Sequence, residues 1–174
     1  MKVYNVVIRT VAALSFALLT SGCSGETEAL EVDKHVLDDM RSVGRVLAET
    51  ETEAIFDGSG VITRLIIVDV DVDVDVDVDV DVDVDVDGSG VESELAAASA
   101  RLQGQGWKVA DERPSQWIEM NSNEWRKTKV TIFGSDFFES SGRYESSVEK
   151  ALRSARSEHG SDGFLVLDAH RTDG

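Results

Sequence analysis

The densest group of possible metal ligands in this sequence is the acidic stretch that ends at Glu94. Asp83, Asp85 and Asp87 alternate with valine, Gly88 follows them, and Glu94 comes eleven residues after Asp83. Calcium binds several oxygen ligands at once, and a glycine permits the sharp turn that brings such ligands together. These residue types at this spacing therefore predict a calcium site in which Asp83, Asp85, Asp87 and Glu94 are the ligands.

Residues 83–94 also resemble the calcium loop of EF-hand and dockerin modules, which reads D-x-D-x-D-G and closes with a glutamate. Gly90 stands where these families have a branched apolar residue, and a Val-Asp segment rather than a helix leads into the loop. An alternative interpretation needs no metal. Ser89 and Glu92 fit the S-x-x-E capping box, which starts a helix by hydrogen bonding alone.

The acidic stretch is the end of a longer repeat, residues 68–87, in which ten Val-Asp pairs follow one another. In a strand this alternation places the valines on one face and the aspartates on the other. Aspartate is a poor strand former, and neighbouring carboxylates on one face repel each other. We therefore expect the first pairs to continue the strand predicted over 61–68 and the rest to project as an extended acidic arm. The alternative is a dipeptide expanded in a tolerant loop, without a function.

Cys23 is the only cysteine of the chain, and the residues before it are those of an export signal. Lys2 gives a positive start, and the apolar run 10–19 is too short to span a bilayer. The segment LLTSGCS, residues 18–24, resembles the lipobox of bacterial lipoproteins, with Thr20 where the family prefers leucine. The resemblance implies that residues 1–22 are removed and that acyl chains such as palmitate on Cys23 anchor the protein to the cell membrane, on its extracytoplasmic face. An ordinary secretory signal with an incidental cysteine is the alternative.

Removal of residues 1–22 takes away Lys2 and Arg9 from 17 basic residues and leaves all 34 acidic ones, so the mature chain carries 15 − 34 = −19. Such a charge argues against nucleic acid as a partner, because phosphate binding needs lysine and arginine. It argues equally against electrostatic attachment to anionic lipid. The expected charged partners are divalent cations or a basic protein surface.

Hydrophobic periodicity predicts a single domain, residues 33–174, which includes the repeat and is joined to Cys23 by the short tether 23–32. Helices are predicted over 33–49, 91–103 and 143–159, the third with Ser141 as its N-cap. Strands are predicted over 61–68, 107–110, 116–120, 125–133 and 164–167. This order predicts an α+β fold: a small, mostly antiparallel sheet with about three helices on one face, preceded by a signal helix.

The leading functional hypothesis is a non-catalytic envelope protein with a binding or structural role. The segment GQGWKV, residues 104–109, and the later strands resemble small actinobacterial envelope lipoproteins of unknown function, a resemblance that implies no catalytic residue. The rival hypothesis is an envelope hydrolase. Its candidates are Asp136 and Glu139 as an acid/base pair, together with Asp168 and His170, which share one face of the last strand. The two hypotheses differ in whether these four side chains converge.

Overall fold

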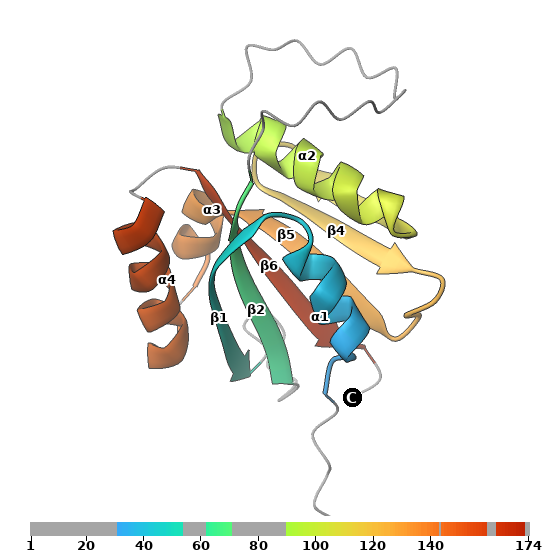
Figure 1. Cartoon of the computed structure of the whole chain (residues 1–174), viewed down its shortest axis with the longest axis horizontal. Helices are drawn as coiled ribbons and strands as arrows, with labels where there is room; N and C mark the ends of the chain where they lie inside the picture. Colours follow the sequence, from blue (N-terminus) through green and yellow to red (C-terminus); the bar gives the residue numbers. More distant parts are fainter. Residues whose placement is uncertain (1–30, 54–61, 71–89, 143, 160–162, 173–174) are drawn as a thin grey trace, which may run out of the picture.

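The structure, a computed structural model, describes residues 31–53, 62–70, 90–142, 144–159 and 163–172 (Figure 1). The helices of this part of the chain are α1 Lys34–Arg41, α2 Gly90–Gly104, α3 Ser135–Ser140 and α4 Ser146–His159. The strands are β1 Arg45–Glu53, β2 Ile62–Asp69, β3 Trp107–Arg113, β4 Trp117–Ser122, β5 Thr128–Gly134 and β6 Phe164–Arg171. The predicted α+β class and the antiparallel sheet are confirmed. The predicted signal helix, Cys23 and residues 71–89 of the Val-Asp repeat lie outside the described residues.

The six strands form one sheet in the order β1-β2-β6-β5-β4-β3, and every neighbouring pair is antiparallel. The central pair of β2 and β6 is buried on both faces: residues 65–68 of β2 and residues 164–167 of β6 are buried without interruption. Because successive side chains of a strand point to opposite faces, such runs require helices on both sides of the sheet.

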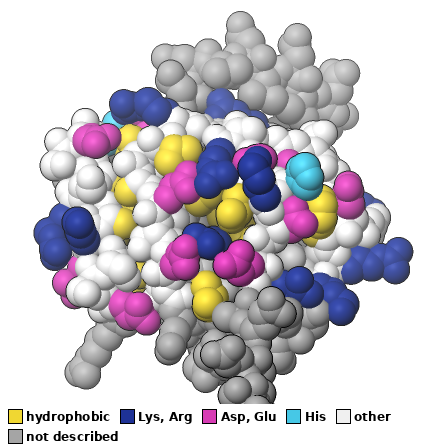
Figure 2. Space-filling view, turned by 60° about the horizontal axis from the view of Figure 1, so that its bottom comes forward, with side chains coloured by type: hydrophobic (Ala, Val, Ile, Leu, Met, Phe, Trp, Pro, Cys, Tyr) yellow, Lys and Arg dark blue, Asp and Glu magenta, His cyan; other side chains and the backbone are white. Residues whose placement is uncertain are grey.

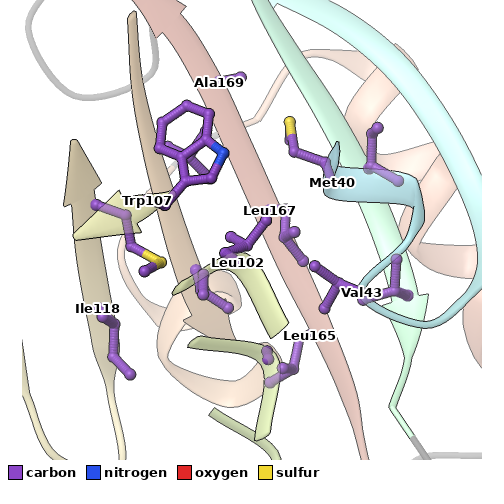
Figure 3. Close-up of a cluster of buried hydrophobic side chains, with 14 of the residues drawn as sticks. Met40, Val43, Leu102, Trp107, Ile118, Leu165, Leu167 and Ala169 are labelled. Carbon is purple, nitrogen blue, oxygen red and sulfur yellow. The ribbon is translucent and has the colours of Figure 1, made fainter. Parts of the chain in front are cut away.

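The helices do cover both faces, so the prediction that they lie on one face is wrong. Ile66 and Val68 of β2 belong to a core with side chains of α1 and α2, including Met40 and Leu102. Figure 3 shows this core, with the indole of Trp107 at its side. The alternate β2 side chains, such as Ile67, belong to a second core formed with α3 and α4. The sheet is therefore the middle layer of three.

The predicted helix over 33–49 is also wrong beyond Arg41, because the chain turns at Gly44 into β1. Gly44 lies so close to the carbonyl oxygen of Asp69 that any Cβ would overlap it. Val43 and Leu47 share a helical spacing, which suggested one helix face. In the structure they belong to the two different cores, one on each side of the sheet. The alternating segment ETETE, residues 49–53, is the strand signal that the helical spacing concealed.

The third predicted helix, 143–159, is confirmed from Ser146 onward, but its predicted N-cap is wrong. Ser141 instead ends the short helix α3, and its hydroxyl donates a hydrogen bond of 2.7 Å to the carbonyl oxygen of Phe138. The helix predicted over 91–103 is confirmed as α2. All five predicted strands are confirmed within a few residues, and Val68 and Asp69 of the repeat do continue β2.

The two ends of the sheet are called the tether end and the repeat end. At the tether end, Glu53 pairs with Ile62 and Thr128 pairs with Arg171, and α1 begins nearby (Figure 1). At the repeat end, Arg45 pairs with Asp69, and α2 begins close to where β2 ends (Figure 1). The tether and the repeat therefore adjoin opposite ends of the sheet.

Candidate functional site

Glu94 is the one predicted calcium ligand that the structure describes. It lies in the second turn of α2, and its side chain is half-buried. Asp83, Asp85 and Asp87 lie outside the described residues. The geometry of the site is therefore set out from Glu94 and the described residues around it.

The Glu94 carboxylate points back toward the start of α2. Its Oε1 atom is 3.8 Å from the position of a Cβ at Gly90 and 3.1 Å from that of a Cβ at Gly163, just before β6. Among the described residues, its Oε2 atom is buried and has no hydrogen-bond partner. Burial raises the pKa of Glu94, the negative charge of Asp69 raises it further, and His159 lowers it. A cation beside Oε2 would balance the negative charge of this carboxylate, and a proton on it would remove that charge.

Asp69, the first aspartate of the repeat, is held by two other elements of the fold. Arg45, at the start of β1, donates to Asp69 Oδ2 over 2.9 Å, and His159, the last residue of α4, lies 3.3 Å from Asp69 Oδ1. Arg45 and His159 are also 3.4 Å apart. With Glu94, this group joins β1, β2, α2 and α4 at the repeat end of the sheet.

Sequence reasoning missed most of this group. His159 is the last residue of the helix predicted over 143–159, and the sequence carries no signal for its contact with Asp69. Arg45 was assigned to the interior of a helix. Both contacts join residues far apart in the chain, so only the sheet topology reveals them. Within the described ranges, no group of three or more His, Cys, Asp or Glu side chains is arranged to hold a metal ion.

The four residues of the hydrolase hypothesis lie in different surroundings. Asp168 is buried, and its Oδ1 atom lies 3.3 Å from Nδ1 of His170. Glu139 instead pairs with Arg156 of α4, and Asp136 is exposed. The helix that carries Asp136 and Glu139 follows the end of β5, which pairs with the start of β6, about 10 Å along the strand from Asp168. The structure therefore does not bring the four side chains together.

Two surface hollows are lined by charged side chains that already pair with each other. One, of about 380 Å³, lies beside α1, where Arg41 makes two hydrogen bonds of 2.7 Å to Glu49 and Arg64 pairs with Glu51. The Arg41 guanidinium lowers the pKa of Glu49 and so keeps this carboxylate ionised. The other, of about 530 Å³, lies between helix α4 and the loop that follows α3. Tyr144 lines this hollow, and burial raises the pKa of its phenol.

Comparison with known proteins adds no family to this description. No protein-family model, no curated protein and no solved structure matches the chain. In the described part of the chain, none of the helices has the length and apolar character needed to cross a membrane.

Proposed function

We propose that this protein is a lipid-anchored, non-catalytic component of a bacterial cell envelope, in which acylated Cys23 tethers the α+β domain to the membrane. The observation that carries the proposal is the sequence LLTSGCS directly after an apolar run of export-signal length. The position of the fold supports it. Val32, nine residues after Cys23, is already buried in the core, so the domain begins as soon as a short tether ends.

A non-catalytic role is favoured by the arrangement of the polar side chains. Asp136, Glu139, Asp168 and His170 do not converge, and the charged groups beside α1 form mutual ion pairs. A hydrolase needs a nucleophile or an activated water together with an acid and a base at one place. In this proposal the domain presents surfaces for binding or structural contact.

The test of the anchor is phase partition of the full-length protein after expression in a bacterium that lipidates exported proteins. The wild type is expected in the detergent phase, with acyl mass on the peptide that begins at Cys23. Cys23→Ala is expected in the aqueous phase, and Ser24→Ala, the matched control, is expected to behave as wild type. A wild-type protein without acyl mass on Cys23 refutes the anchor.

A second candidate function, calcium binding, is favoured by the carboxylate of Glu94. It points back over Gly90, the first residue of α2, and its Oε2 atom is buried without a partner in the described part of the chain. The closing glutamate of an EF-hand-like loop needs such an orientation. Millimolar affinity, typical of extracellular calcium modules, would suit an envelope protein.

Calorimetric titration of the mature chain with calcium tests this candidate. Heat that saturates in the wild type and vanishes in both Asp87→Asn and Glu94→Gln supports a defined site. Glu92→Gln is the matched control, because it removes one carboxylate from the same helix without touching the predicted ligands. Equal weak binding in all variants identifies a nonspecific polyanion instead.

A further inference from the structure

β3 lies at one edge of the sheet, with β4 as its neighbour and no second neighbour among the described strands. Its first residue, Trp107, is buried, whereas residues 108–113 are all exposed. An edge strand of this kind presents backbone N–H and C=O groups with which another strand can pair. The exposed edge of β3 is therefore a place where a partner can extend the sheet.

This edge includes a large hydrophobic side chain. Val109 is 40 % exposed, although it pairs with Met120, a buried residue of the core beneath α1 and α2. Val46 on the other edge strand, β1, is 37 % exposed and lies on the same face, opposite Val68 of the same core. The two edges thus expose the same residue type on the same face, and β3 is distinguished by the charges around its valine.

A β-bulge decides on which face of the sheet these charges lie. Lys108 pairs with Asn121 and Asp111 pairs with Glu119, but Ala110 has no partner on β4. Residues 119 and 121 are two apart on β4, so they point to one face. The extra residue of the bulge shifts the alternation of β3. Lys108 and Asp111 therefore lie together on the face opposite Val109, although they are three positions apart.

In the described part of the chain, neither Lys108 nor Asp111 forms an ion pair. Asp111 Oδ1 accepts a hydrogen bond of 2.9 Å from the backbone N–H of Glu112. Across the ladder Asp111 lies opposite Glu119, a like charge, and Lys129 is bound to Glu119 over 2.9 Å. Like charges in such a position are unfavourable, so a further positive charge beside Asp111 would be stabilising.

A second copy of β3 can supply that charge when the two strands pair antiparallel. If Val109 of one copy lies opposite Ala110 of the other, then Lys108 lies opposite Asp111, and two-fold symmetry repeats both pairs. Because of the bulge, the members of each pair lie on the same face of the joined sheet. A shift of one residue in either direction puts them on different faces and removes both ion pairs.

We propose that the edge of β3 is a homodimer interface, at which two copies of the chain pair in this register and join their sheets. Charged side chains and bulges on an edge strand ordinarily oppose pairing with other strands. On β3 they permit one register with a second copy, so they also select the partner. The interface contains two reciprocal ion pairs on one face and the exposed valines on the other.

The net negative charge of the chain does not oppose this pairing, because the four charged residues of β3 are two basic and two acidic. Basic and acidic side chains are also interspersed, rather than gathered into one patch of either sign, on the described surface that Figure 2 shows. A local pattern of charges such as that of β3 is therefore the feature by which a partner can be recognised.

The dimer does not require the lipid anchor proposed above, but its symmetry is compatible with it. The two-fold axis is perpendicular to the joined sheet, so the α1 and α2 layers of both copies lie on one side. The tether leads into α1, and both anchors can therefore reach one membrane. A seven-residue edge buries less surface than a standard interface. We expect weak association in dilute solution and stronger association where the copies are concentrated on a membrane.

The test is disulfide cross-linking of the full-length protein in the bacterial envelope. Val109→Cys is expected to form a covalent homodimer on mild oxidation, because this thiol lies next to its symmetry mate, within the reach of a disulfide. Val46→Cys, the matched control, should not cross-link above wild type, whose single thiol is Cys23. In the Val109→Cys background, Lys108→Glu and Asp111→Lys should each lower cross-linking about 10-fold, because each makes both ion pairs repulsive. The two substitutions together should restore it.

Restored cross-linking in the charge-swapped variant supports the register and also shows that both substitutions are compatible with folding. A charge-swapped variant that stays as low as the single variants overturns the register. Equal cross-linking of Val109→Cys and Val46→Cys overturns the interface, and a product whose mass differs from twice that of the chain overturns the choice of a second copy. Phase partition of the same samples reports on the anchor separately, since the disulfide does not depend on acylation.

Discussion

The two ends of the sheet hold their charged groups in different ways. At the repeat end, Asp69 is bound by Arg45 and His159, and the half-buried Glu94 lies near it with an unpartnered oxygen among the described residues. At the tether end, the basic side chains of residues 126 and 127 are exposed on a turn. Buried charges couple to folding, whereas exposed charges couple mainly to external surfaces and to salt. We therefore expect the stability of the domain to depend on pH through the repeat end more than through the tether end.

We expect the largest loss of stability from a substitution in the core near the tether end. Trp107 is 2 % exposed, and its Nε1 atom donates a hydrogen bond of 2.9 Å to Asp39 of α1. Trp107→Ala removes this bond and opens a cavity between α1, α2 and the sheet, so we expect a loss of about 3–5 kcal/mol in the free energy of unfolding. Urea denaturation measures it. Val109→Ala on the same strand is the control, because Val109 is 40 % exposed and its loss should cost less than about 0.5 kcal/mol.

At the repeat end, the position most sensitive to substitution is Gly44, where the chain approaches the end of β2 closely. Gly44→Ala places a Cβ against the carbonyl oxygen of Asp69, and we expect a destabilisation of about 1–3 kcal/mol because the backbone must shift. The control is Gly104→Ala, whose Cβ meets nothing within 4 Å and should cause no loss of stability. Equal melting temperatures for the two variants would show that the backbone at Gly44 moves freely.

Gly44 also shows why part of the fold escaped sequence analysis. The helical spacing of Val43 and Leu47 was real, but a spacing of four residues also fits positions on either side of a turn. The glycine between them and the alternation ETETE that follows were the signals for β1. The uninterrupted apolar run of β2 likewise indicated burial on both faces, against the prediction of helices on one face only.

A smaller part of the candidate site than of the fold could be predicted from the sequence. The ligand pattern of residues 83–94 is local, so it could be read from spacing, and the start of the helix that carries Glu94 was predicted within one residue. The surroundings of Glu94 were not predictable, because Asp69, His159 and Gly163 come from three other parts of the chain. The stack of Trp125 on His35 joins residues ninety positions apart and had no sequence signal.

Glu94 should make stability depend on pH at the repeat end. Burial and Asp69 raise its pKa in the folded state, so its favourable contribution is complete below the unfolded pKa and is lost as the pH rises through the folded pKa. Glu94→Gln stays neutral, and in the presence of a chelator it should therefore be more stable than wild type at pH 7 and equal to it near pH 4. The gain should stay below about 1 kcal/mol, because Glu94 is only half-buried and solvent screens its charge.

Thermal unfolding across this pH range measures the difference, with Glu92→Gln as the control on the same helix. A Glu94→Gln variant that is less stable than wild type at pH 7 in chelator would contradict an unfavourable buried charge. It would indicate that the ionised carboxylate has a stabilising partner.

The smallest expected effect belongs to the repeat itself. Deletion of Val72–Asp81 removes five whole Val-Asp pairs, so the sequence that enters the repeat from β2 and the sequence that leaves it toward α2 both stay unchanged. If the repeat projects from the domain, the deletion only shortens a connection. Halving such a connection changes the free energy of unfolding by about 0.6 kcal/mol or less. Melting curves recorded with a chelator compare the deletion variant with Val68→Ala. This substitution removes two methyl groups from a fully buried side chain and should lower the free energy of unfolding by about 1.6 kcal/mol. A deletion that destabilises as much as Val68→Ala would show that the removed pairs pack against the domain, and the repeat end would then be a buried surface rather than the origin of an acidic arm.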